Sequence, residues 1–372
     1  MSRINLDDNL ARNLRLSGAS FNTVEATLQG TYRIANDGPQ ILYFNPNGTS
    51  RVVFLPQRDI MGGQLILIGN NGTDDRQLRI FTPSGVELAQ ISNDETFIFV
   101  SLPSGWQIAT RNIREVLTLN RTYFVDDAFG SDTNSGTSPV TPFKTIQKAI
   151  DTGASLDFGP SNLVVINVAA GTYPDPITTK PYVGIGPMII QGADPGTTII
   201  STTNNFGIFH ANPSVYKFSN LRITTAGTGF HCILCSLGAR LQLDNIDFGP
   251  AGGGNAIHVS MTFNSVVVMD SNYKISGSAQ QHISVAANCS AQFAGRTITI
   301  TGTPAFAIAF LQATQGGVIA YNGNTFVGTC TGASATVSSN GVIDCFIGTN
   351  VGAAAYLPGD HTFTETTGGR LL

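Results

Sequence analysis

Five short β-like runs each end in a glycine: Ile223-Thr-Thr-Ala-Gly227, Ile246-Asp-Phe-Gly249, Tyr273-Lys-Ile-Ser-Gly277, Ile298-Thr-Ile-Thr-Gly302 and Phe326-Val-Gly328. The closing glycines are 22, 28, 25 and 26 residues apart, and a second apolar run precedes each segment. A period near 25, with several short strands per repeat and no helical pattern between them, is typical of a parallel β-solenoid. We therefore predict an all-β fold with about eight stacked coils, each pairing its backbone with its neighbours.

The composition agrees with stacked coils. Charged residues make up 12% of the 372 residues, and the net charge is −4. Charged side chains are costly inside a stacked core, and an outer surface this poor in charge suggests that another chain partly covers it. Neither half of the chain is basic, so we expect no nucleic-acid partner. No run approaches 18 apolar residues, so we expect no membrane span.

The part before the repeats has a different pattern. Residues 1–20 are polar and resemble a short N-terminal arm; they contain no apolar run, so we expect no secretory signal. Residues 21–112 hold short β-like runs separated by glycine turns about ten residues apart, which predicts a small antiparallel β-sandwich. Residues 113–122 are interpreted as a linker.

A distinctive segment leads into the repeats. It reads Tyr123-Phe-Val-Asp126, Gly130-Ser-Asp-Thr-Asn-Ser-Gly-Thr137 and Thr141-Pro-Phe-Lys-Thr-Ile-Gln-Lys-Ala-Ile150. Thr141 can cap a helix and Pro142 suits its first position, so we predict a helix over 141–152 that shields one end of a solenoid spanning 123–357. The tail, 358–372, or a neighbouring subunit would close the other end.

Acidic and polar side chains in this segment, Asp126, Asp127, Asp132 and Asn134, suggest a calcium loop at first sight. They lack the spacing and the closing Glu of a calcium loop, so we interpret them as turn residues that accept backbone hydrogen bonds. We expect no metal ion and no cofactor.

Few side chains could carry catalysis, and we assign no catalytic residue. Asp244 and Asp270 follow the apolar runs of consecutive repeats, so we expect them to stack one coil apart, about 5 Å along the axis. Asp247 would lie nearby but on the other face. Glycoside hydrolysis uses two carboxylates, which makes these three residues the best catalytic candidates. The alternative is a structural role at coil corners.

Four histidines, His210, His231, His258 and His282, recur at intervals of 21, 27 and 24 residues. Their register drifts by one residue per coil, so we expect no continuous histidine ladder. His231, His258, His282 and Tyr273 are candidates for contact with a sugar or a weakly bound metal; ordinary structural roles are the alternative. Five aromatic residues could face a glycan or fill the lumen: Tyr173, Phe206, Tyr216, Phe230 and Tyr273.

The entry segment and the coils of about 25 residues behind it resemble the pectin-lyase-like family of right-handed parallel β-helices, in particular those of bacteriophage tail fibres and tailspikes. That family contains polysaccharide lyases, hydrolases and epimerases as well as inert fibres, and its phage members usually form trimers. The resemblance implies a structural virion protein, a homotrimeric tail fibre or spike, made in the host cytoplasm.

Residues 1–112 would attach this virion protein to other virion proteins, and its β-helix would take part in host attachment by binding surface polysaccharide. Two alternatives remain. One is a polysaccharide-degrading tailspike enzyme, a lyase or glycoside hydrolase, on the same scaffold. The other is a head-surface fibre or decoration protein.

Overall fold

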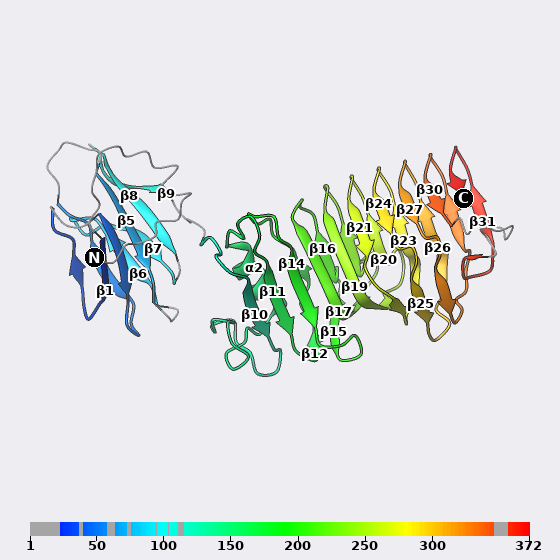
Figure 1. Cartoon of the computed structure of the whole chain (residues 1–372), viewed down its shortest axis with the longest axis horizontal. Coiled ribbons are helices and arrows are strands. Elements are labelled where there is room, and N and C mark those ends of the chain that lie inside the picture. Colours follow the sequence, from blue (N-terminus) through cyan, green and yellow to red (C-terminus); the bar gives the residue numbers. More distant parts are fainter. Residues whose placement is uncertain are drawn as a thin grey trace. The chain divides into compact units, whose positions relative to one another are not determined.

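The computed structural model describes residues 23–36, 40–57, 64–72, 76–93, 95–102, 104–110, 115–345 and 356–372. The predicted arm, 1–20, lies outside them. The chain forms two compact units, Met1–Val116 and Leu117–Leu372, and their boundary falls within the predicted linker (Figure 1). Leu117 is buried in the core of the second unit, so the last part of the predicted linker belongs to that unit. Among the described helices, none has the length and hydropathy needed to cross a membrane.

The first unit contains two sheets, between which the chain alternates. One has the order β1 (Thr23–Thr27), β3 (Ile41–Asn45), β5 (Leu65–Asn70), β8 (Thr96–Leu102) and β9 (Gly105–Thr110). The other has the order β2 (Tyr32–Arg33), β4 (Arg51–Phe54), β6 (Leu78–Phe81) and β7 (Glu87–Ile91). The first three strands of each sheet are parallel. The prediction of an antiparallel sandwich was therefore wrong in strand direction: only the pairings of β7, β8 and β9 are antiparallel.

The second unit is a parallel β-solenoid, as predicted (Figure 1). Its fifteen-stranded sheet has a main path of ten strands: β10 (Arg121–Val125), β11 (Val164–Val168), β14 (Met188–Gly192), β17 (Val215–Ala226), β19 (Arg240–Ala251), β21 (Val266–Met269), β24 (Ser290–Gln292), β27 (Val318–Ala320), β30 (Val342–Asp344) and β32 (Arg370–Leu371). Beside this path lie β12 (Gly171–Tyr173), β15 (Thr198–Thr203), β22 (Tyr273–Ile275), β25 (Thr297–Ile300) and β28 (Thr325–Val327).

The eight-stranded sheet faces the other side of the lumen. It comprises β13 (Ile177–Thr178), β16 (Ile208–His210), β18 (Ile233–Cys235), β20 (Ile257–Met261), β23 (Ala279–Val285), β26 (Phe306–Ala313), β29 (Ala335–Val337) and β31 (Phe363–Glu365). The main path alone has ten strands, so the stack has more turns than the eight coils predicted. The right hand of the coil stays a prediction, based on the general handedness of parallel crossovers.

The tail belongs to the stack. β31 pairs with β29, and β32 pairs with β30, both in parallel. The solenoid therefore continues past its predicted limit at residue 357, and the predicted tail supplies the last strand of each sheet. The run Phe363-Thr-Glu365 is too short to be recognised as a strand without the partner strand that aligns it.

One helix, α2 (Ile146–Ala154), covers the first coils, where it contacts β10, β11 and β13. It starts later than predicted, because its N-cap is Thr145 and not Thr141. The residues before it are held in an extended conformation, since Phe143 forms a bridge with Val125 of β10. The helix buries Ile146, Ala149 and Ile150 and shields this end of the core, as predicted.

Two strands of the fifteen-stranded sheet bend at asparagines. Asn220 in β17 and Asn245 in β19 have φ values of 55° and 49°, and Asn245 Nδ2 donates to Asn220 Oδ1 at 2.9 Å. Asparagine tolerates this left-handed conformation better than most residues, so the two strands bend at neighbouring positions. The bend separates two outer surfaces of the same sheet.

Candidate functional site

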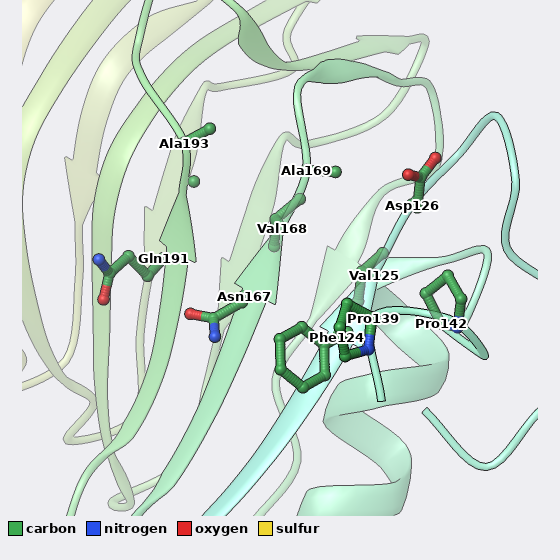
Figure 2. A pocket seen from close by; sticks show the side chains of 11 residues that line it. Phe124, Val125, Asp126, Pro139, Pro142, Asn167, Val168, Ala169, Gln191 and Ala193 are labelled. Carbon is green, nitrogen blue, oxygen red and sulfur yellow. The ribbon is translucent and has the colours of Figure 1, made fainter. Parts of the chain in front are cut away.

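A cavity of about 330 Å³ opens on the outside of the first coils. Phe124, Asn167 and Gln191 form its floor from β10, β11 and β14, where they are successive register partners. Figure 2 shows the side chains of Asn167 and Gln191 next to each other on neighbouring strands. Asp126 and two prolines, Pro139 and Pro142, also line it, and the remaining lining residues are small or apolar: Val125, Val168, Ala169, Gly192 and Ala193. An aromatic ring, two amides and a carboxylate are groups suited to a sugar-sized ligand.

The wall of this cavity is the entry segment. Asp126 Oδ1 accepts hydrogen bonds from the backbone N–H groups of Ala128 and Phe129 at 2.9 and 3.0 Å. Asp132 Oδ1 accepts from the N–H groups of Lys144 and Thr145, both at 2.9 Å. Both carboxylates are thus turn and cap acceptors, in agreement with the interpretation as turn residues and not as calcium ligands.

The floor of the cavity continues along the solenoid. Gln191 aligns with Ser219 of β17, and Ser219 aligns with Asp244 of β19. Asp270 follows Met269, the register partner of Leu243, and its N–H donates to Leu243 O at 2.7 Å. We call this row the outer polar column; it contains Phe124, Asn167, Gln191, Ser219, Asp244 and Asp270. The prediction that Asp244 and Asp270 stack on successive coils agrees with this register.

A lysine joins the two carboxylates. Lys217 Nζ lies 3.0 Å from Asp244 Oδ2 and 3.0 Å from Asp270 Oδ2. Partial burial raises the pKa of Asp244, but hydrogen bonds from Ser271 and Lys217 and nearby positive charge outweigh it, so its pKa is lowered. Partial burial lowers the pKa of Lys217, but its two aspartates outweigh this and raise it. Asp244 is therefore a carboxylate at neutral pH and a poor general acid.

Asp247 lies beyond the bend at Asn245, on a different outer surface; the bend, and not strand alternation, separates it from Asp244. It is 3% exposed, and Asp247 Oδ2 lies 3.5 Å from Lys274 Nζ and 4.0 Å from Arg222 Nε. Lys274 and Arg222 belong to the neighbouring coils, so the three charges form a short ladder. Asp247 and the Asp244–Asp270 pair therefore do not form one site.

Three of the residues predicted to contact a ligand are buried. His258, His282 and Tyr273 are 0%, 0% and 3% exposed and lie in the lumen, where a glycan cannot reach them. His258 Nδ1 lies 3.1 Å from His282 Nδ1, and His282 Nε2 lies 3.0 Å from the Tyr273 hydroxyl. These residues are a correction to the expected alternation: His258 and His282 are 24 residues apart, which is the register between β20 and β23, so both rings lie in the lumen.

His231 remains a surface candidate. It is partly buried, and its ring lies 5.5 Å from that of Phe206, which also contacts the rings of Phe209 and Phe230. Burial lowers the pKa of His231 to about 4, so it is neutral at pH 7. Of the five aromatic residues considered for glycan contact, Phe206 and Phe230 are partly accessible, whereas Tyr173, Tyr216 and Tyr273 are buried.

Sequence reasoning missed Phe124, Asn167 and Gln191. Each is the fourth residue of a five-residue strand, with Val125, Val168 and Gly192 after it. Only the strand register shows that the three side chains share one surface.

The described residues contain no group of three or more His, Cys, Asp and Glu side chains that could hold a metal ion. Comparison with known proteins adds no relative: no protein-family model, no curated protein and no solved structure matches the chain.

Proposed function

We propose that this chain is a structural virion protein of a bacteriophage, a trimeric tail fibre or spike whose β-helix binds a host-surface polysaccharide. The proposal combines the resemblance of the entry segment with a stack of parallel coils that follows, in the sequence, a separate compact unit. In this proposal the first unit attaches to other virion proteins and the solenoid contacts the host surface.

The outer polar column carries the glycan part of the proposal. It offers a ring and amides on the first coils and carboxylates further along the axis of the stack, whereas Ser219, between them, is buried. The spacing of coils, about 4.8 Å, is close to the length of one sugar unit in an extended chain. Sugars bind through ring stacking and hydrogen bonds to amides and carboxylates, which are the groups in this row.

Binding is tested with the full chain and surface polysaccharides purified from candidate hosts, by calorimetry. Replacing Asn167 and Gln191 with alanine should weaken binding about tenfold or more, since each removes a hydrogen-bonding amide worth roughly 1 kcal/mol. Gln242→Ala is the matched control, because Gln242 is an outward amide of β19 outside the column. An equal loss of affinity in Gln242→Ala, or no loss of affinity when Asn167 and Gln191 are replaced, would show that the outer polar column does not bind the glycan.

The enzyme alternative is less well supported. Glycoside hydrolysis needs one carboxyl group that is protonated when the substrate binds. Asp244 has a lowered pKa and shares Lys217 with Asp270, which keeps the aspartates as structural counterions. We therefore expect the bound polysaccharide to keep its chain length after prolonged incubation. Shortened products from the parent chain that disappear in Asp244→Asn would favour the tailspike enzyme.

Labelling assembled particles with an antibody against this chain tests the virion assignment. Label on tail fibres supports the proposal, and label on the capsid surface favours the alternative of a head fibre or decoration protein. Absence of the chain from purified particles would overturn the virion assignment without bearing on glycan binding.

A further inference from the structure

The two sheets of the solenoid differ sharply in charge. Seven of the eight strands of the eight-stranded sheet (β13, β16, β18, β20, β23, β26 and β29) contain no Asp, Glu, Lys or Arg. Glu365 of β31 is the exception, and its carboxylate accepts a hydrogen bond from the Leu371 N–H. In the fifteen-stranded sheet, two strands are enough to supply five charged residues: β17 and β19 contain Lys217, Arg222, Arg240, Asp244 and Asp247.

The outward side chains of the eight-stranded sheet form a second continuous row. We call it the neutral column; its members are Thr178, Phe209, Leu234, Ser260, Ser284, Gln312, Thr336 and Thr364. Most of them are small. Ser284 Oγ donates to Gln312 Oε1 at 3.1 Å, and Gln312 Nε2 donates to Thr336 Oγ1 at 3.3 Å. Side chains of this row thus bond along the sheet, and none of the eight is charged.

An apolar corner borders this surface. Leu237 and Phe263 occupy the turns after β18 and β20 and are 64% and 58% exposed. The two turns stack, because the Gly238 N–H donates to Phe263 O at 2.8 Å. Both residues have positive φ, 56° and 55°, which is unfavourable for bulky side chains. Strain and exposed apolar surface coincide at these two positions, as they do at sites selected for an interaction.

We propose that the neutral column and the Leu237–Phe263 corner form the surface through which copies of this chain associate. This inference rests on the self-association part of the proposed function and names the face that carries it. A surface without charge has no attraction for a polyanion or a basic partner, whereas two copies of it meet without repulsion.

The area is sufficient for such an interface. Eight strands at about 4.8 Å give a length of roughly 34 Å, and about five residues across strand and turn give roughly 16 Å. Two copies would then bury about 1,100 Å² together, near the lower end of stable protein interfaces, which begin at about 1,000 Å². In a closed trimer the three surfaces would face the common three-fold axis, so each copy would share its surface between its two neighbours.

The test is the native mass of the full chain, measured by light scattering at several micromolar concentrations. The parent should be a trimer, and Ser284→Arg should be mostly monomeric, because it places a charge in the middle of the neutral column. Gln292→Arg is the matched control: Gln292 is exposed on the fifteen-stranded sheet, so this variant should keep the parent mass.

A second variant separates association from folding. Phe263→Asn relieves the unfavourable backbone conformation, so the melting temperature should stay equal or rise while association weakens about tenfold or more. Ile185→Asn, which removes another exposed apolar side chain, should leave association unchanged.

The outcomes distinguish the two proposals. If the parent is a monomer, self-association and this surface are both overturned. If the parent is a trimer but folded Ser284→Arg and Phe263→Asn remain trimers, only the face is overturned. Binding of a neutral glycan to a monomeric parent, lost in Ser284→Arg, would assign the neutral column to a ligand instead.

Discussion

His258 and His282 lie on successive coils with their Nδ1 atoms 3.1 Å apart in the lumen. One ring must donate and the other accept, so at least the accepting imidazole must be neutral. His282 Nε2 continues the network to the hydroxyl of Tyr273, which bonds to that of Tyr321. Burial lowers the pKa of His258 to about 3, and burial together with His258 lowers the pKa of His282 well below its usual range.

These histidines predict loss of stability in acid. A lowered pKa in the folded state means that the unfolded chain takes up protons first as the pH falls below about 6.5. Between pH 7.5 and pH 5 each buried histidine should cost about 2 kcal/mol of unfolding free energy. His210, whose pKa is lowered to about 4 by burial, adds to the effect. Urea unfolding at the two pH values measures it; His258→Gln should reduce the difference, and equal stability at both values would contradict the prediction.

The ion pairs of Lys217 with Asp244 and Asp270 predict a modest energetic coupling between substitutions at these residues. Lys217→Met leaves Asp244 and Asp270 facing each other without a counterion, and should cost about 1 kcal/mol because the three groups are partly exposed. Asp270→Asn in the same chain should recover part of this loss, since it removes the repulsion. A double-mutant cycle by urea unfolding measures the coupling, and strict additivity of the two substitutions would show that the bridge contributes nothing.

The hydrogen bonds that Asp132 accepts around the helix cap Thr145 predict a larger loss of stability from one substitution. Its carboxylate accepts from the Lys144 and Thr145 N–H groups and from the Thr145 hydroxyl. Asp132→Ala should lower the unfolding free energy by about 1–2 kcal/mol, whereas Asp132→Asn keeps one acceptor oxygen and should lose less. Calcium should leave the melting temperature of the parent unchanged; a clear rise that disappears in Asp132→Ala would restore the interpretation as a calcium loop.

The sequence predicted the solenoid because its signal is periodic. The closing glycines repeat, and β17, β19 and β22 are found where the apolar runs place them. Features that depend on a distant partner were not predictable. Thr141 has the right chemistry for a cap, but Asp132, in the preceding loop, selects Thr145 instead by binding its backbone. The parallel strands of the first unit likewise depend on how the chain alternates between sheets, which a pattern of short runs does not specify.

The candidate site was predictable only in part, for a related reason. Asp244 and Asp270 could be aligned because each follows the same kind of run in consecutive repeats. Asn167 and Gln191 lie in coils whose closing segments differ, so their shared surface required the strand register. The lumen positions of His258 and His282 depend on which way each side chain points within β20 and β23, which the spacing of the histidines does not specify.

The closing glycines are required for two different physical reasons. A Cβ at Gly277 would collide with the backbone of Gly249 and Pro250 in the preceding coil. At Gly302 a Cβ would meet no atom within 4 Å, but φ is 76°, which other residues adopt with strain. Gly277 therefore allows the coils to approach, whereas Gly302 allows the chain to turn.

Two alanine substitutions test this difference. Gly302→Ala should cost about 1–2 kcal/mol, the strain of a left-handed residue. Gly277→Ala must push two coils apart and should cost about 3 kcal/mol or more. Gly302→Asn provides the control for strain and should recover part of the loss at that site, while Gly277→Asn should be no better than Gly277→Ala. Comparable losses for the two alanine variants, measured by urea unfolding, would mean that coil spacing is not set by the closing glycines.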